Sequence, residues 1–339
     1  METAIINATE HTSAITNSCD KFGNLYGRFI DYVDASPKTI ATYKQNLRPF
    51  IAYLRAHGIT NPDRDTVRSY RDALMDLNGM RRIREAMGCE NLDKVRPAKE
   101  STVKAYMAVV KVFFSWLEDE GIHPNVTRHI KSPKVQASHT SDFLTATQAA
   151  QLLESIKRTH GNAARRDYIM CNLALALGLR TVEIERANIE HLHQVDGHFV
   201  LDVQGKGSKI VPMRIDDGVA AMLMEYLQSR GDLDKGAPLF VATSNHQAGD
   251  GRIPAKSISR IIKSHMVNAG IESERITAHS LRHTAAMLKL RTSNGNLKAT
   301  QEFLRHSDPK TTMIYLQELD TANDTSSEDV MGMIRSAAI

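Results

Sequence analysis

Apolar residues recur at helical spacing in three stretches of the first half of the chain. In the first, Ser36 and Pro37 supply an N-cap and a first-turn proline, and apolar positions then follow every three or four residues until Gly58. The other two stretches span residues 65–77 and 101–121. The pattern predicts a small all-helical bundle, in which order begins near residue 22.

The pattern changes in the second half of the chain. Thr145 can cap a helix, and a further helix is expected over residues 168–177. Between residues 198 and 213 apolar and polar positions alternate on either side of Gly205-Lys206-Gly207. This alternation predicts a β-hairpin with a lysine at its tip. Because the remainder is again mostly helical, the expected fold class is mainly α with a small β-sheet or hairpin in the second domain.

Segments without sustained periodicity mark the expected boundaries. Residues 1–20 are polar and predict a flexible tail, whereas residues 123–140 hold two prolines and no regular apolar pattern, which is typical of a linker. Residues 80–99 are weakly periodic and predict a loop or a short helix. The expected division is a tail (1–20), a helical domain (21–122), a linker (123–140), a second domain (141–318) and a C-terminal tail or helix (319–339). A chain of 339 residues is long enough for two cores, although a single domain stays the alternative.

The net charge of +4 is small, but it is unevenly distributed. Residues 21–140 carry 20 basic and 13 acidic side chains, whereas residues 141–339 carry 23 of each. A basic surplus suits a surface that displaces counterions from a phosphate backbone, and a merely soluble basic surface explains it equally well. The candidate DNA contacts are Lys44, Arg48, Arg81, Arg82, Arg84, Lys104 and Lys111.

Cysteine usage and hydropathy exclude several classes of protein. Cys19, Cys89 and Cys171 are far apart and lack the pair spacings of zinc or redox sites, so we expect reduced thiols. No apolar run reaches the roughly 18–20 residues of a membrane span, and the N-terminus lacks the order of a signal peptide. We therefore expect a cytoplasmic protein without a membrane partner, and the DNA-binding interpretation of the basic surplus would associate it with the nucleoid.

Candidate chemistry lies in four pieces of the second half, each weak when taken alone. They are Leu177-Gly178-Leu179-Arg180-Thr181-Val182-Glu183, Gly205-Lys206-Gly207-Ser208-Lys209, His279-Ser280-Leu281-Arg282-His283, and His306 followed by Tyr315. An arginine after a glycine is usually surface charge, a lysine in a turn is usually solvated, and a lone tyrosine is usually a core or surface aromatic. In this order and spacing, however, the four pieces supply what phosphoryl transfer without a metal requires.

The chemistry of that reaction assigns a role to each group. Arg180 and Arg282 can hold the non-bridging oxygens of one phosphate and offset its growing charge. A phenol with a pKa of about 10 needs a base or cationic surroundings to lose its proton, and His279 with the two arginines can supply them. The leaving deoxyribose oxygen needs a general acid. We assign that acid to Lys206, with Lys209 as the alternative.

Together the motifs resemble the signature boxes of the tyrosine recombinase, or phage integrase, family. The resemblance covers residues 144–316. It rests on Gly178-Leu179-Arg180, Gly205-Lys206-Gly207, His279-Ser280-Leu281-Arg282-His283, Leu304-Arg305-His306 and Thr311-Thr312-Met313-Ile314-Tyr315. The helical first half is similar, less specifically, to the SAM-like core-binding domain of that family. Two residues depart from the family pattern: Arg305 stands where the family usually has Gly, and Met213 differs from the usual small set after Pro212.

The resemblance implies a two-domain, C-shaped clamp around a double-stranded DNA core site. It implies that Tyr315 forms a 3′-phosphotyrosyl bond, that Arg180 and Arg282 hold the phosphate, that Lys206 protonates the 5′-oxygen, and that His279 and His306 assist. No metal or nucleotide cofactor is then needed. It also implies self-association to a cyclic tetramer on DNA, with the C-terminal helix docked on a neighbouring protomer; packing of that helix on its own domain is the alternative. We identify no extra small β domain in the sequence before the helical half, so we expect a simple Xer-like, integron-like or mobile-element recombinase.

Two further residues are expected to support these groups. Glu183 follows Arg180 at a spacing that lets its carboxylate face the arginine, although an ordinary surface acid is equally compatible. His283 is expected to be a packed or hydrogen-bonded histidine. With His279 it has the i, i+4 spacing of a helical zinc pair, but the glutamate of the His-Glu-x-x-His box is absent, so we expect no metal.

Other functions use the same residues. A type IB topoisomerase or a telomere resolvase employs the same chemistry, and a DNA-binding regulator could keep the fold without it. All six reacting positions are occupied, which disfavours the regulator. The sequence indicates neither the DNA target, nor accessory factors, nor whether the outcome is integration, excision or dimer resolution.

Overall fold

The chain divides into two compact units, residues 1–137 and 138–339. The structure, a computed structural model, describes residues 21–134, 143–205, 209–231, 234–243, 249–273 and 275–306, together with residues 309, 312, 313 and 315. The predicted tails 1–20 and 319–339 and most of the linker's second half lie outside these residues.

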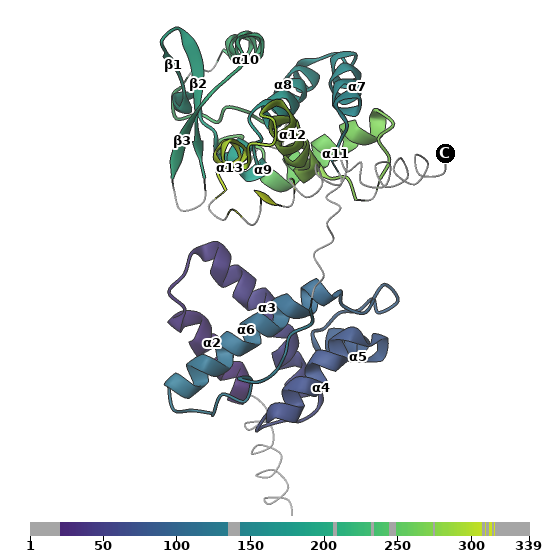
Figure 1. The fold of residues 1–339 in the computed structure, drawn as a ribbon. Helices are drawn as coiled ribbons and strands as arrows, with labels where there is room; N and C mark the ends of the chain where they lie inside the picture. The colour runs from purple at the N-terminus through teal and green to yellow at the C-terminus, as the bar shows by residue number, and fades with distance from the viewer. Residues whose placement is uncertain are drawn as a thin grey trace, which may run out of the picture. The chain divides into compact units, whose positions relative to one another are not determined.

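Helices alone make up the described regular structure of the N-terminal unit (Figure 1). They are α2 (Lys21–Tyr32), α3 (Pro37–Ala56), α4 (Arg64–Met75), α5 (Leu77–Ala86) and α6 (Glu100–Asp119). Helix α3 is central, because it packs against α2, α5 and α6. The core between them is aromatic: the rings of Phe29 and Phe113 meet edge to face with centroids 5.2 Å apart, and Phe50 packs on Tyr70 in the same way.

Local capping explains where these helices begin and end. The Ser36 hydroxyl accepts a hydrogen bond from the Thr39 backbone N–H at 3.3 Å, and Pro37 occupies the first turn, as predicted. Asp76 ends α4 and also caps α5, where its carboxylate accepts from the Gly79 N–H at 2.8 Å. Asp76 therefore sets the boundary between α4, which matches the helix expected over residues 65–77, and α5. The first part of the segment 80–99 lies in α5, and the segment 87–99 forms no helix or strand.

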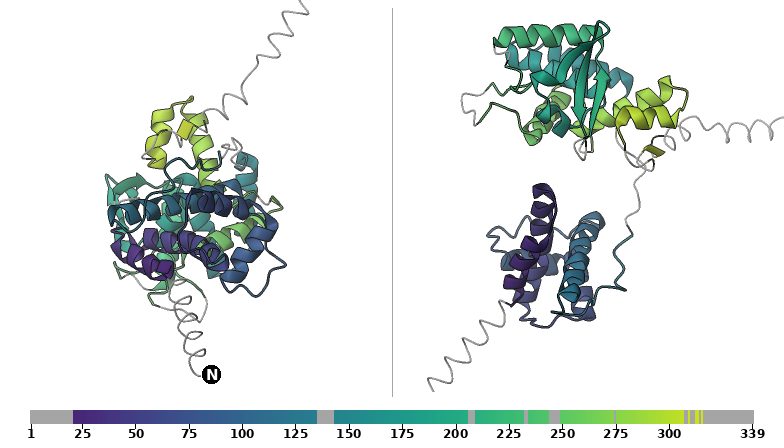
Figure 2. Two further views of the ribbon diagram at one scale, coloured as in Figure 1. Left: turned by 90° about the horizontal axis from the view of Figure 1, so that it is seen from below. Right: turned by 90° about the vertical axis from the view of Figure 1, so that its left-hand side faces the viewer.

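The C-terminal unit combines helices with a three-stranded antiparallel sheet of order β1-β2-β3 (Figures 1 and 2). Its helices are α7 (Ala146–Lys157), α8 (Asn162–Ala176), α9 (Thr181–Arg186), the short 3₁₀ helix η1 (Ile189–His191), α10 (Asp217–Arg230), α11 (Ala255–Asn268), α12 (Ala278–Thr292) and α13 (Leu297–Leu304). Its strands are β1 (Leu192–Val195), β2 (His198–Gln204) and β3 (Ile210–Arg214). Helix α8 lies at the centre, in contact with α7, α10 and α12.

The predicted hairpin is confirmed as β2 and β3, with Val203 paired to Val211. Its tip, residues 206–208, lies outside the described residues, so the placement of Lys206 is not defined. Strand β1 was not predicted, because four residues of mixed polarity give too short an alternation to detect. Thr145 caps α7 in a capping box with Gln148, and α8 begins six residues before the expected start at Tyr168.

The fold class is therefore mainly α with a small sheet in the second unit, as the sequence predicted. The structure brings the pieces that carry candidate chemistry into this second unit, on the turn before α9, on α12 and after α13. Within the described ranges, no helix has the length and apolar character needed to cross a bilayer.

Candidate active site

The site is built around the turn that joins α8 to α9. Gly178 has a positive φ of +58°, and a Cβ there would lie 3.1 Å from the Leu304 side chain and 3.2 Å from that of Phe303. Both the conformation and the close approach favour glycine at this position. The turn places Arg180 at the N-cap of α9 and leaves the Gly178 carbonyl facing the arginines of the site.

The Glu183 carboxylate binds both the backbone and the side chain of Arg180. The Glu183 carboxylate accepts from the Arg180 backbone N–H at 2.9 Å and from Nη1 at 2.8 Å. Its side chain is 2% exposed, whereas that of Arg180 is 33% exposed. Burial opposes ionisation, but Arg305, the bonds from Arg180 and the charge of Arg282 outweigh it and lower the pKa of Glu183 below its ordinary value. Glu183 is thus a buried carboxylate that anchors Arg180, and not the surface acid that the sequence left open.

Arg282 lies on α12 and is the most deeply buried cation of the site, with a side chain 1% exposed. It donates to the carbonyl oxygens of Gly178 and Leu304, and Nη1 lies 3.9 Å from a Glu183 oxygen. Burial and the neighbouring charge of Arg180 lower the pKa of Arg282 to about 9. The group therefore stays charged at neutral pH.

Arg305 ends α13 in the left-handed conformation, with φ at +55°. A residue other than glycine pays roughly 1–2 kcal/mol for this conformation, which accounts for the glycine that the family motif has here. The guanidinium turns inward: Nη2 lies 2.9 Å from Glu183 Oε2, and Nη1 donates to the Leu177 carbonyl at 3.1 Å. The structure thus places a third arginine at the site, which the sequence marked only as a departure from the motif.

The hydroxyl of Tyr315 shares a hydrogen bond with Nδ1 of His283. His279, one turn earlier on α12, packs its ring edge to face on that of His283, with centroids 4.6 Å apart. Burial, His279 and Arg282 lower the pKa of His283 to about 4, so the imidazole is neutral at pH 7 and able to accept a proton. Burial, Arg282 and Arg180 likewise lower the pKa of His279.

His306 follows Arg305, so the left-handed turn sets its direction. Its Nδ1 is hydrogen-bonded to the hydroxyl of Thr312 at 2.8 Å, and Gln301 donates to its carbonyl at 3.1 Å. Burial and the positive charges of Arg282, Arg180 and Arg305 lower the pKa of His306 to about 4. A neutral imidazole, with its orientation fixed by Thr312, is suited to a hydrogen bond with an anionic substrate.

The structure brings together most, but not all, of the residues that the sequence predicted for the site. Seven of the named residues form one connected group of contacts and charges: Arg180, Glu183, His279, Arg282, His283, His306 and Tyr315. Lys206 lies outside the described residues, and Lys209 is exposed just before β3. The sequence did not identify the direct bond from His283 to the phenol, although the i, i+4 spacing from His279 was a signal for a shared helix face.

The described residues contain no group of three or more His, Cys, Asp or Glu side chains arranged to hold a metal ion.

In the N-terminal unit, the candidate DNA contacts come from α3, α5 and α6, and α3 packs on both of the other helices. Lys44, Arg48, Arg81, Arg82 and Lys104 are exposed, whereas Arg84 and Lys111 are half-buried. Nη2 of Arg48 donates a hydrogen bond to the Met87 carbonyl at 3.0 Å.

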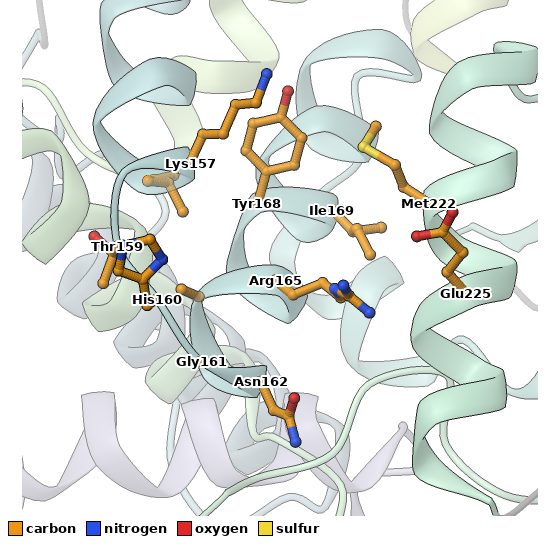
Figure 3. Close-up of a pocket in the computed structure, with 12 residues that line it drawn as sticks. Lys157, Thr159, His160, Gly161, Asn162, Arg165, Tyr168, Ile169, Met222 and Glu225 are labelled. Atoms are coloured by element: carbon orange, nitrogen blue, oxygen red, sulfur yellow. The ribbon is translucent and has the colours of Figure 1, made fainter.

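A separate pocket of about 450 Å³ lies between α7, α8 and α10 (Figure 3). Lys157, Arg165, Tyr168 and Glu225 are among the residues that line it. The figure shows Lys157 and Tyr168 pointing the same way, with Met222 and Glu225 opposite them on α10. None of the residues with a predicted role in the reaction lines this pocket, so it is distinct from the arginine and histidine cluster.

Comparison with known proteins agrees with the geometry of the cluster. Residues 142–322 match the phage integrase family, and residues 27–121 match the phage integrase N-terminal SAM-like domain. The tyrosine recombinase XerC of Roseiflexus sp. (strain RS-1) is 30% identical over 321 residues, which cover 91% of this chain and 94% of that protein. XerC of Caldanaerobacter subterraneus subsp. tengcongensis is 28% identical over 317 residues, covering 87% of this chain and 83% of that protein.

Two solved structures share the fold. The XerH site-specific recombinase bound to a palindromic difH substrate aligns with a TM-score of 0.64 at 20% identity, over 86% of this chain and 80% of that one. A lambda integrase dimer bound to a COC′ core site aligns with a TM-score of 0.60 at 16% identity, over 87% and 76%. With its two matched domains and its full-length relatives, the chain belongs to the phage integrase family and is a tyrosine-type site-specific recombinase.

Proposed function

We propose that this recombinase cleaves and rejoins a double-stranded DNA core site, with Tyr315 as the nucleophile. The observation that carries the proposal is the clustering of the Tyr315 hydroxyl with His283 and Arg282, with His279 packed on the His283 ring; Tyr315 and Arg282 are buried. A phosphate placed against this cluster meets a phenol, two imidazoles and Arg282, and Arg180 lies beside it on the shared carboxylate of Glu183. These are the groups that an in-line attack on a phosphodiester needs.

In the proposed step, Tyr315 Oη forms a bond to phosphorus and the bond from phosphorus to the 5′-oxygen breaks. The phenolic proton passes to the imidazole system, where His283 is the hydrogen-bonded group and His279 lies beside it. Lys206 gives a proton to the departing 5′-oxygen. Arg180 and Arg282 offset the charge on the non-bridging oxygens, and His306 adds a hydrogen bond.

The product of this step is a 3′-phosphotyrosyl bond and a free 5′-hydroxyl. A 5′-hydroxyl from another strand reverses the reaction and restores the phosphodiester. Because the phosphotyrosine conserves the energy of the cleaved bond, we propose that no metal or nucleotide cofactor takes part. His283 can serve as the proton acceptor despite its low pKa, because an incoming phosphate brings negative charge that stabilises an imidazolium.

The N-terminal unit is proposed to bind the same DNA through phosphate contacts from α3, α5 and α6. Its basic surplus supports this assignment, as does the shared fold with a lambda integrase bound to a core site. A lambda integrase tetramer bound to a Holliday junction also shares the fold, with a TM-score of 0.58 at 16% identity. We propose that this chain also forms a tetramer on DNA, with cyclic symmetry, and that it acts in the nucleoid.

Product analysis tests the proposal. Plasmids that carry two copies of a bound core site should give recombinants of the size set by the two sites. A plasmid that carries one site should give no intramolecular recombinant. Relaxed circles from plasmids without the site would instead identify a topoisomerase, and covalently closed hairpin ends would identify a resolvase. Either product in place of recombinants would contradict the proposal.

A further inference from the structure

Arg305 and Met213 are the two residues that depart from the family motifs, and their side chains contact each other in the folded protein. Nη1 of Arg305 reaches Sδ of Met213, which lies on β3. The two residues are 92 positions apart in the sequence. Strand β3 follows directly from the hairpin tip that carries Lys206. The contact therefore joins the sheet to the cluster of arginines.

The same guanidinium contacts three other parts of the site. Nη1 donates to the Leu177 carbonyl, and Nη2 donates to the Gly178 carbonyl at 3.2 Å and pairs with Glu183 at 2.9 Å. The Arg305 side chain is 4% exposed, so it offers a substrate far less surface than Arg180 does. Its position suits an action on the other side chains of the site.

The backbone conformation of Arg305 indicates that its side chain has a specific function. Glycine adopts the left-handed conformation at φ +55° without the steric cost that an arginine pays. The contacts of the guanidinium must offset that cost. The arginine also leaves its Nε buried without a hydrogen-bond partner, which space-filling alone would not favour.

We propose that Arg305 is a positioning residue: it keeps Glu183 ionised and in place, and Glu183 in turn holds the Arg180 guanidinium where it meets the scissile phosphate. The inference rests on the proposed function, because Arg180 matters here as a phosphate ligand. Arg305 thus acts on the reaction through Glu183 and Arg180, without touching the substrate.

The charges around Glu183 determine how the loss of Arg305 changes the pKa of its carboxylate. The carboxylate faces Arg180 at the start of α9, Arg282 and His279 on α12, and Arg305 after α13. Among the influences that lower its pKa, Arg305 is the largest, and burial acts in the opposite direction. Without Arg305 the pKa of Glu183 rises, and a protonated Glu183 no longer holds Arg180 by a charged bond.

The test compares Arg305→Met with Arg305→Lys on a nicked core-site substrate. Methionine is also a long side chain and has the same steric cost in the left-handed conformation, but it removes the charge. Lysine keeps the charge. We expect the cleavage rate of Arg305→Met, plotted against pH, to begin its acid decline at a higher pH than that of the wild type. Below that pH, the rate should fall about tenfold per pH unit. Arg305→Lys should restore most of the wild-type profile. In Arg305→Met combined with Glu183→Gln, this displaced decline should disappear.

Thermal unfolding gives a readout that does not depend on activity. Relative to wild type, Arg305→Met should lose most stability at neutral pH and progressively less as the pH falls, because a raised Glu183 pKa matters only where Glu183 ionises. If methionine prevents folding, Arg305→Gly replaces it, since glycine suits this backbone. Wild-type profiles in Arg305→Met, or equal losses in the lysine and methionine variants, would overturn the inference. Absence of adducts from wild-type protein would instead contradict the proposed function.

Discussion

The Tyr315 hydroxyl is hydrogen-bonded to Nδ1 of His283, a histidine that lies one helical turn after His279 on α12. The sequence assigned His283 a structural part and gave His279 the task of assisting the phenol. In the folded protein, the His279 ring packs on the His283 ring, which in turn packs on the Tyr315 ring. The first expectation follows from this order of contacts.

Replacing His283 by leucine should slow formation of the covalent adduct by on the order of a hundredfold or more, because a positioned base contributes about that much. DNA affinity should change little, since the phosphate-binding arginines remain. Single-turnover cleavage rates and binding isotherms measure the two effects separately. Faster cleavage by His283→Leu would show that this bond holds Tyr315 in a resting position and does not activate it.

Stability of the C-terminal unit should fall as the pH is lowered from about 6.5 to about 4. The folded-state pKa values of His283 and His306 are about 4, below the ordinary value of 6.5. In this window the unfolded chain takes up protons that the folded chain does not, so acidification favours unfolding. Glu183, whose pKa is also lowered, adds a loss in the same direction at the acid end.

Calorimetry at several pH values measures this dependence. His306→Asn should reduce the proton uptake on unfolding by up to one proton, seen as a shallower slope of the free energy against pH. Trp116, the single tryptophan, lies in the N-terminal unit, so its fluorescence identifies the transition of that unit as an internal control. An unchanged slope in the His306 variant would contradict the prediction.

Several of these features follow from the sequence, and the reasons differ. The caps at Ser36 and Thr145 and the hairpin of β2 and β3 are local, so spacing and residue type suffice to predict them. The motif pattern likewise named seven residues that the fold brings into one group of contacts and charges. Arg305 shows the limit: the sequence identifies an arginine where glycine is usual, but its bonds to Glu183 and Leu177 join residues 122 and 128 positions apart. Such pairings depend on the tertiary fold.

The general acid can be identified by chemical rescue. Lys206→Ala should cleave an ordinary core site slowly but cleave normally when sulfur replaces the 5′-oxygen, because a thiolate leaves without a proton. Lys209→Ala should keep its activity on both substrates. Rescue of Lys209→Ala, without rescue of Lys206→Ala, would assign the acid to Lys209.

DNA binding by the N-terminal unit should depend on salt through a small number of phosphate contacts. Lys44→Ala and Lys104→Ala are each expected to reduce the slope of log K against log salt by about 1, and to weaken binding to all sequences alike. Lys157→Ala, in the pocket of the other unit, is the matched control and should leave the slope unchanged. Loss of preference for one base, with an unchanged slope, would mean that the residue reads bases and not phosphates.

Covalent trapping tests the central claim most directly. Wild type, Tyr315→Phe and His283→Leu are incubated with nicked suicide substrates drawn from a library of candidate core sites, and adducts that resist SDS are isolated. The account predicts adducts from wild type, with the 3′-phosphate of the DNA joined to Tyr315, and none from Tyr315→Phe despite normal DNA binding. An adduct that persists in Tyr315→Phe, or no adduct on DNA that the wild-type protein binds, would contradict it.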